Sequence, residues 1–412
     1  MTDDGSKTLT IEQALRIALA AQREGRVEQA ASIHAQILAR DPENGDALHL
    51  LGTLEIDRGN LAEAERLLRR VVACYPSVSA FRASLAKALH RLGRADEAIG
   101  HAAQALAGDP GNPGIREVAN QILRVEPSLE LLRLPSSIQP VEARPAPAPD
   151  DSLVLGLATG YRTAALKPFV RSLREHYQGP VHLIVDNDAE TLAFLAGHDI
   201  STGLAKDRAA HPVINRFAEY RDFIETIDEG TRILLTDVSD VVFQGNPFAF
   251  SVRGNGRAGA EPGFIAVLED VSQSLGSCPW NSDWLRVHFG TRMLQRLGDR
   301  RISCIGTIFG DRDGLLDYLN RFCLLAASLP VPGVYGLDTA IHNVLLHHEM
   351  TRESVALENG WPVATVQHMT ESAIAVRGEK IRLEDERLPL VVHQYNRRAA
   401  MLAHVERHHA GG

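Results

Sequence analysis

The sequence predicts two domains of different class: an all-α helical repeat, followed by an α/β domain with a Rossmann-like, mixed but mostly parallel sheet. Three observations lead to this prediction. Small residues and prolines recur at a fixed period in the first third of the chain, and a proline-rich break follows. The remainder alternates short apolar runs with amphipathic helical patterns. At 412 residues the chain is also too long for one ordinary hydrophobic core.

The first third of the chain repeats every 34 residues. The glycines of the repeat stand where a helix must end and turn, because glycine tolerates the left-handed backbone there. The prolines end the second helix of each unit. The period and the recurring residues resemble the tetratricopeptide repeat over residues 11–112. Residues 114–132 are then predicted to form a capping helix, and we assign residues 8–133 to this domain. The three columns are Pro42, Pro76 and Pro110; Gly25, Gly59 and Gly93; and Ala30, Ala64 and Ala98.

Repeats of this type form scaffolds. One interpretation is a groove that recruits a protein, peptide or glycan acceptor; the alternative is that the array serves only for homodimerisation or as a rigid spacer. Three repeats are near the minimum for a stable array. The sequence does not indicate the ligand.

Residues 134–150 contain five prolines and no apolar periodicity, which predicts an extended, semi-rigid linker. Residues 151–400 then form the predicted α/β domain. Ligands of open α/β sheets bind beyond the carboxyl ends of the strands, so polar residues that follow a strand are the first candidates for a site. We expect strands at 152–158, 181–185, 232–236, 264–268 and 302–309, and helices at 165–176, 213–227, 284–297, 315–327 and 338–347.

Two carboxylates follow the central predicted strand, at Asp237 and Asp240. Carboxylates at the end of a buried strand are costly unless a cation offsets their charge, and Mg²⁺ or Mn²⁺ bound with a nucleoside diphosphate does so. The segment ILLTDVSDVVFQGNPF (233–248) resembles the metal-binding D-x-D motif of GT-A-fold glycosyltransferases. Its D-x-x-D spacing is that of the collagen hydroxylysine glycosyltransferase group. The alternative is an ordinary turn at the end of a strand, where Asp and Ser are favoured.

The segment LVVHQYNRR (390–398) resembles the terminal H-[FY]-N segment of the metal-dependent members of this superfamily, with one extra residue, Gln394, after the histidine. The resemblance covers about residues 152–397. It implies Asp237, Asp240 and His393 as ligands of Mn²⁺ or Mg²⁺, with Asp237 also reaching the ribose of the nucleotide sugar or a metal-bound water. Otherwise His393 simply caps a strand.

Further residues correspond to the nucleotide part of such a site. Thr159 and Tyr161 follow the first strand, where this fold holds the base and ribose. Arg216 and Tyr220 are four residues apart on one helix face, and Arg216 could offer its planar guanidinium to the diphosphate. A strand-to-helix turn and a surface ion pair are the structural alternatives.

The sugar part of the site is predicted from two segments. Gly306 and Thr307 belong to the strand CIGTIFG, whose glycines indicate close approach to a donor sugar or to a packed helix. Asp338 resembles the acidic position of the family's G-x-D-Q helix start and is the catalytic candidate, in contact with acceptor or donor sugar; it is otherwise a helix N-cap. The polar–aromatic segment 279–284 is predicted to be a loop that stacks on sugars or anchors the core.

The sequence therefore predicts a metal-dependent glycosyltransferase that moves a sugar from a nucleotide diphosphate sugar, a UDP-sugar by default, to an acceptor hydroxyl. An inactive transferase-like domain in a repeat scaffold and a nucleotidyltransferase are the alternatives. Phosphate-loop, G-x-S-x-G and H-E-x-x-H motifs are absent. The net charge of −9 argues against nucleic acid as a partner. Scattered cysteines and the lack of a signal or membrane-spanning segment predict a cytoplasmic protein, which includes a peripheral place at the inner membrane face.

Overall fold

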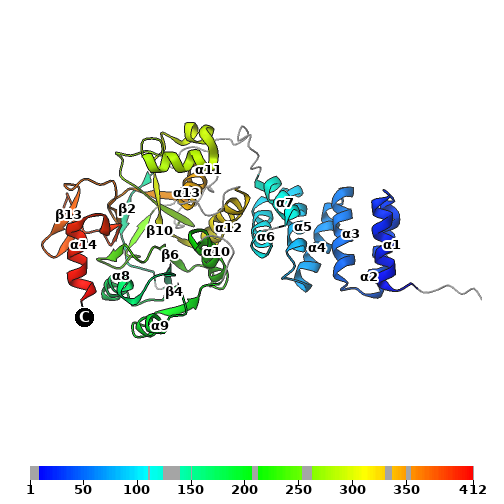
Figure 1. Cartoon of the computed structure of the whole chain (residues 1–412), viewed down its shortest axis with the longest axis horizontal. Coiled ribbons are helices and arrows are strands. Elements are labelled where there is room, and N and C mark those ends of the chain that lie inside the picture. The colour runs from blue at the N-terminus through cyan, green and yellow to red at the C-terminus, as the bar shows by residue number, and fades with distance from the viewer. Residues whose placement is uncertain are drawn as a thin grey trace, which may run out of the picture. The chain divides into compact units, whose positions relative to one another are not determined.

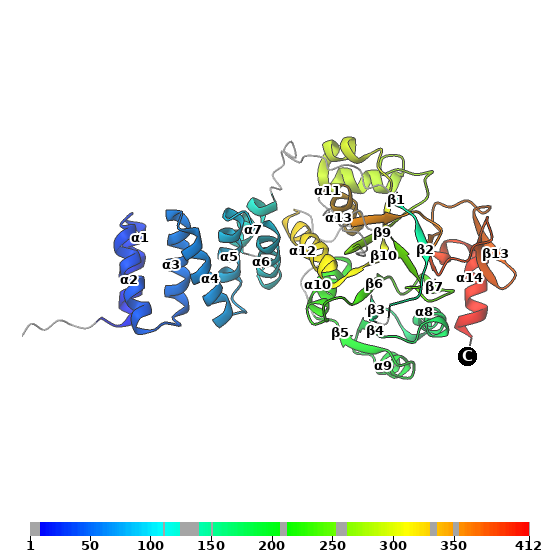
Figure 2. The same ribbon diagram turned by 180° about the vertical axis from the view of Figure 1, so that it is seen from behind.

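The computed structural model describes residues 9–109, 112–123, 140–149, 151–206, 212–252, 262–329, 336–348 and 354–411. The chain divides into two compact units, residues 1–127 and 128–412. The first unit consists of helices, and the second is built on a large sheet (Figures 1 and 2).

The first unit is a series of antiparallel helix pairs, and the predicted glycine column ends the first helix of each pair. Gly25, Gly59 and Gly93 have φ angles of +76°, +84° and +80°, the left-handed backbone that glycine adopts without strain. A side chain at Gly52 would lie 2.7 Å from Cγ of Leu68, so the absence of one lets α3 and α4 approach closely. The helices are α1 Ile11–Arg23, α2 Val27–Arg40, α3 Gly45–Arg58, α4 Leu61–Cys74, α5 Ser79–Arg91, α6 Ala95–Gly108 and α7 Pro113–Leu123.

The predicted capping helix corresponds to α7, which packs on α5 and α6. Residues 124–132, predicted to continue it, lie outside the described residues. The repeat architecture of the N-terminal part is thus confirmed.

The second unit is organised by an eight-stranded sheet with the order β1-β11-β9-β10-β6-β3-β4-β5. β10 runs antiparallel to both of its neighbours, and the other pairs are parallel, as predicted for a mixed, mostly parallel sheet. Its strands are β1 Pro140–Val141, β3 Ser152–Leu157, β4 Val181–Val185, β5 Ser201–Leu204, β6 Arg232–Thr236, β9 Phe264–Leu268, β10 Ser303–Asp311 and β11 Ser354–Leu357.

Helices cover both faces of this sheet, because its central strands are apolar on both sides. Phe169 of α8 packs edge-to-face on Phe243 on one face, and Phe217 of α10 stacks on Phe322 of α12 on the other. Figure 1 shows α10 and α12 side by side. The helices are α8 Thr163–His176, α9 Ala189–Ala196, α10 Pro212–Ile224, α11 Pro279–Leu297, α12 Arg312–Ser328, α13 Leu337–His348 and α14 Ala399–Val405.

A three-stranded sheet, β12-β15-β7, brings two distant segments together. β7 (Val241–Phe243) follows β6 after four residues, and it pairs antiparallel with β15 (Val391–His393), so that His393 lies opposite Val241. β12 (Val363–Thr365) completes the sheet. The remaining short strands are β2 Ala143–Pro145, β8 Phe250–Val252, β13 Ile374–Arg377 and β14 Lys380–Leu383.

Two segments differ from the sequence-based expectation. Residues 140–145, expected within the linker, form β1 and β2, which pair with β11 and β8. Proline is tolerated in such edge strands because one side of the strand has no neighbour to which a backbone N–H must donate. Residues 279–284, expected to be a loop, form the start of α11, because proline is favoured in the first turn of a helix. The second unit also extends beyond residue 400, through α14.

Candidate active site

A pocket of about 710 Å³ opens at the carboxyl ends of β3, β6 and β9. β3 is parallel to β6, and β6 and β9 share a direction because both are antiparallel to β10. The residues that follow these strands therefore meet at one edge of the sheet, as expected for a ligand site in an α/β fold.

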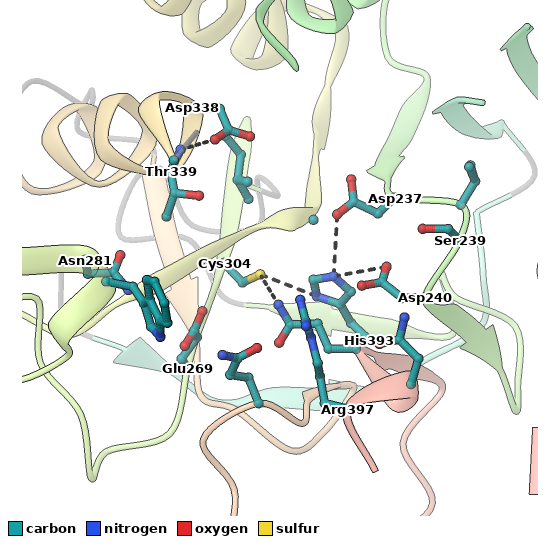
Figure 3. A pocket seen from close by; sticks show the side chains of 18 of the residues that line it. Asp237, Ser239, Asp240, Glu269, Asn281, Cys304, Asp338, Thr339, His393 and Arg397 are labelled. Atoms are coloured by element: carbon teal, nitrogen blue, oxygen red, sulfur yellow. Dashed lines mark hydrogen bonds and ion pairs between the residues drawn. The ribbon is translucent and has the colours of Figure 1, made fainter. Parts of the chain in front are cut away.

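Asp237, Asp240 and His393 lie together in the wall of this pocket (Figure 3). Asp237 directly follows β6, Asp240 directly precedes β7, and His393 ends β15. Nε2 of His393 is 3.6 Å from Oδ2 of Asp237 and 3.6 Å from Oδ1 of Asp240. One ligand atom from each residue lies within 4.8 Å of the other two, and no other such group was found among the described residues.

Two observations fit these residues to a divalent cation. Oδ1 of Asp240 and Nε2 of His393 are buried, and neither has a hydrogen-bond partner among the described residues. Oxygen and imidazole donors at such positions are suitable ligands for Mn²⁺ or Mg²⁺. In addition, a side chain at Gly306 would lie 2.5 Å from Nε2 of His393 and 2.6 Å from Oδ2 of Asp237. The glycine therefore keeps this space open.

The electrostatics of the three residues also favour a positive charge between them. Burial lowers the pKa of His393, but the nearby Cys304 and Asp240 outweigh burial and raise it well above its usual value. Burial raises the pKa of Asp240, and the neighbouring Asp237 adds to this. The pKa of Asp237 is lowered, because Arg216 and His393 outweigh its burial. The site therefore favours a positive charge beside His393, and a metal cation bound to Nε2 would supply it in place of a proton.

Arg216 links the cluster to a third carboxylate. Its Nη1 donates to Oδ1 of Asp237 at 2.6 Å, and its Nη2 donates to Oδ2 of Asp338 at 2.9 Å. The guanidinium also lies over the ring of Phe217, which fixes its plane. Asp237 thus offers one oxygen to Arg216 and the other to the His393 side of the cluster.

Asp338, the predicted catalytic residue, lines the pocket at the start of α13. Its Oδ1 accepts from the backbone N–H of Thr339 at 2.8 Å, and its Oδ2 accepts from Arg216. Burial raises its pKa, and Arg216 opposes this. Both oxygens are engaged, so the contacts visible here position Arg216, and a catalytic role for Asp338 stays a prediction.

The other predicted site residues fall into two groups. Thr159, Tyr161 and Gly306 line the pocket. Tyr220 is 3% exposed and Thr307 is fully buried, and neither is among the pocket-lining residues. Thr307 follows Gly306 in β10, and adjacent side chains of a strand point to opposite faces.

The structure adds residues that the sequence analysis missed, chiefly Glu269, His368 and Arg397. Glu269 directly follows the apolar strand β9, the same signal that drew attention to Asp237. His368 and Arg397 follow weak, short strands of the small sheet, so no sequence pattern marked them.

Comparison with known proteins supports the repeat assignment. The tetratricopeptide repeat family matches residues 21–88. No match was found among curated proteins. The first tetratricopeptide domain of Spaghetti bound to an HSP90 peptide is 17% identical over 28% of this chain and 90% of that chain, with a TM-score of 0.27. A MamA structure is 28% identical over 30% of this chain and 69% of its own, with a TM-score of 0.25.

A mutant of Thermobaculum terrenum O-GlcNAc transferase is 22% identical over 55% of this chain and 46% of that chain, with a TM-score of 0.25. The alignment thus spans less than half of that transferase. No helix among the described residues is long and apolar enough to cross a membrane.

Proposed function

We propose that the second unit is a metal-dependent glycosyltransferase domain of the GT-A type, which transfers a sugar from a nucleoside diphosphate sugar to an acceptor hydroxyl. The observation that carries this proposal is the cluster of Asp237, Asp240 and His393 at the carboxyl end of the central strand. Oδ1 of Asp240 and Nε2 of His393 are buried without a hydrogen bond to any described residue, and they lie beside a space that Gly306 keeps free of side chains.

The cluster and the neighbouring Arg216 have distinct parts in binding the donor. Asp237, Asp240 and His393 would hold Mn²⁺ or Mg²⁺, and the bound cation would offset the negative charge that develops on the departing nucleoside diphosphate. Arg216 is held by two carboxylates at the pocket wall, so its charge faces the same region. A planar guanidinium suits recognition of phosphate oxygens.

Other residues that line the pocket suit the remaining parts of the nucleotide sugar and the acceptor. Thr159 and Tyr161, after β3, are available to the base and ribose, and Tyr161 is 39% exposed. Trp280, which is 62% exposed, offers an aromatic face to an acceptor sugar. The repeats would recruit a protein, peptide or glycan acceptor.

The reaction class is tested by its products. With Mn²⁺ and UDP-glucose, UDP-galactose or UDP-N-acetylglucosamine, the protein should release UDP and transfer or release the sugar. Release of pyrophosphate would instead indicate nucleotidyl transfer. A folded protein that binds no nucleotide sugar and releases neither product would contradict the proposal.

A further inference from the structure

A second ionisable pair lies in the wall of the same pocket, apart from the metal-binding cluster. Nδ1 of His368 is 2.5 Å from Oε2 of Glu269. A carboxylate only accepts hydrogen bonds, so Nδ1 carries the proton and donates it to Glu269. The lone pair of the imidazole is then on Nε2.

This Nε2 belongs to the pocket. Both His368 and Glu269 line the pocket, and their side chains are 18% and 8% exposed. Among the described residues, Nε2 has one hydrogen-bond contact, with Sγ of Cys278, another lining residue, at 4.0 Å. Sulfur at this distance is a weak partner, so Nε2 keeps its capacity to accept a proton.

The pair and the metal-binding cluster lie at the same edge of the sheet. Glu269 follows β9 and Asp237 follows β6, two parallel strands separated only by β10. Two strand spacings are about 10 Å. Cys304, near the start of β10, lies between Glu269 and His393 in the view of Figure 3.

The position of His368 is also coupled to the cluster. The backbone N–H of Val366 donates to the carbonyl oxygen of His393 at 3.0 Å, and Met369 N–H donates to the carbonyl of Val366 at 3.1 Å. The turn that carries His368 is therefore attached to the end of β15. Glu269 is fixed by its own backbone N–H, which donates to the carbonyl of Ile302 at 2.8 Å.

We propose that His368, oriented by Glu269, is the general base that accepts the proton of the attacking acceptor hydroxyl. This inference rests on the proposed glycosyltransferase function and names the residues that activate its acceptor. A base oriented by a carboxylate is the arrangement that activates hydroxyl groups in many enzymes.

The acceptor oxygen forms a bond to the anomeric carbon, and the bond between that carbon and the phosphate oxygen breaks, with its electrons retained by the leaving nucleoside diphosphate. The hydroxyl proton moves to Nε2 of His368. The imidazolium that results is stabilised by its hydrogen bond to the Glu269 carboxylate.

Asp338 is less suited to this task. Both of its oxygens already accept hydrogen bonds, whereas His368 has a ring nitrogen directed at no strong partner. The step described above is a single displacement, in which the acceptor oxygen enters opposite the departing phosphate oxygen. The proposal therefore predicts that the anomeric configuration of the sugar is inverted.

Water can replace the unidentified acceptor in the test. The full chain is incubated with Mn²⁺ and UDP-glucose, UDP-galactose, UDP-N-acetylglucosamine or GDP-mannose, and the released sugar is followed by NMR before it mutarotates. The variants are His368→Gln, Glu269→Gln and Glu269→Asp. The matched control is Glu190→Gln, an exposed carboxylate of α9 outside the pocket.

We expect the inverted anomer as the first product. His368→Gln should lower kcat by about 100-fold or more, the usual range for loss of a general base. Glu269→Gln should lower kcat with little change in the KM for the donor, Glu269→Asp should recover part of the rate, and Glu190→Gln should behave as wild type. Mn²⁺-dependent UDP binding by each variant shows that it is folded and that its donor site is intact.

Three results would overturn the inference while leaving donor binding in place: a retained anomer as first product, wild-type kcat in His368→Gln, or no hydrolysis by a wild-type protein that binds the donor. The absence of hydrolysis contradicts the inference because a general base that lines a solvent-filled pocket should also activate water. Failure of the wild-type protein to bind either UDP or GDP with Mn²⁺ would instead contradict the proposed function itself.

Discussion

Nδ1 of His393 lies 3.4 Å from Sγ of Cys304, while Nε2 of the same ring faces the carboxylates of Asp237 and Asp240. Histidines that bind metals are commonly oriented by a carboxylate or a carbonyl on the second nitrogen. Here a buried thiol contacts that nitrogen. Cys304 therefore holds the imidazole in the orientation that presents Nε2 to the cation.

Removal of this contact should weaken metal binding. We expect Cys304→Ala to lower the affinity for Mn²⁺, measured by EPR titration in the presence of UDP, by about 10- to 100-fold. Cys304→Ser keeps a polar partner for Nδ1 and should retain most of the affinity. Cys323→Ala, on α12 and outside the pocket, is the control. Equal Mn²⁺ affinity in Cys304→Ala and wild type would rule out the positioning role.

Gly306 should tolerate no side chain. The Cβ of Gly306→Ala would lie 2.5 Å from Nε2 of His393 and 2.6 Å from Oδ2 of Asp237, closer than real Cβ atoms approach other groups. We expect Mn²⁺-dependent UDP binding to be lost, as measured by calorimetry. Gly197→Ala, where a Cβ meets nothing closer than 3.4 Å, should bind normally. Normal binding by Gly306→Ala would show that the space beside this glycine is not the cation site.

Arg216 should contribute to stability as well as to donor binding. Arg216→Met leaves Asp237 and Asp338 without their shared cation, and we expect a loss of about 3 kcal/mol in the free energy of unfolding. The second change Asp338→Asn should recover part of this loss, because it removes one unpaired charge. All three tryptophans lie in the second unit, so tryptophan fluorescence reports its unfolding in urea. Additive effects of the two substitutions would contradict a direct coupling.

Two buried histidines of α13 should make the second unit less stable in mild acid. Burial lowers the pKa of His342 to about 3 and that of His347 to about 4, from the usual 6.5. Between these values and 6.5 the unfolded chain binds protons that the folded chain does not. The contribution of the two neutral histidines to the free energy of unfolding is therefore complete above pH 6.5 and is lost as the pH falls.

Between its folded pKa and pH 6.5, each of these histidines should lower the free energy of unfolding by about 1.4 kcal/mol for each unit by which the pH falls. His342→Gln removes one such site, so its unfolding free energy should fall less steeply than that of wild type between pH 6 and pH 5. Urea titrations followed by tryptophan fluorescence, with chelator present, measure the difference. Parallel curves would contradict the assignment of a neutral His342 in the folded protein.

Several features were predictable because a local pattern determines them. The left-handed glycines at 25, 59 and 93 follow from a helix that must turn at each repeat. Asp237 could be identified because an apolar strand ends directly before it. His393 was found through its resemblance to a short motif, and the structure brings it to Asp237 and Asp240. Their role as metal ligands remains a prediction.

Other features depend on contacts that no local pattern encodes. The pairing of His368 with Glu269 joins residues 99 positions apart. Thr307 was predicted to face the donor together with Gly306, but the strand alternation directs only one of two adjacent residues to the pocket. Similarly, Tyr220 shares a helix face with Arg216, yet it is buried beneath the pocket wall, where tertiary packing decides exposure.

The central claim is that Asp237, Asp240 and His393 form a cation-dependent nucleotide site. The most direct measurement is a calorimetric titration of UDP, then GDP, into the full chain with Mn²⁺ and with chelator, beside Asp240→Asn. We predict binding of one nucleotide that requires Mn²⁺ and is abolished in the folded variant. Binding that is independent of Mn²⁺ and unchanged in Asp240→Asn, or no binding by the folded wild-type protein, would contradict the account.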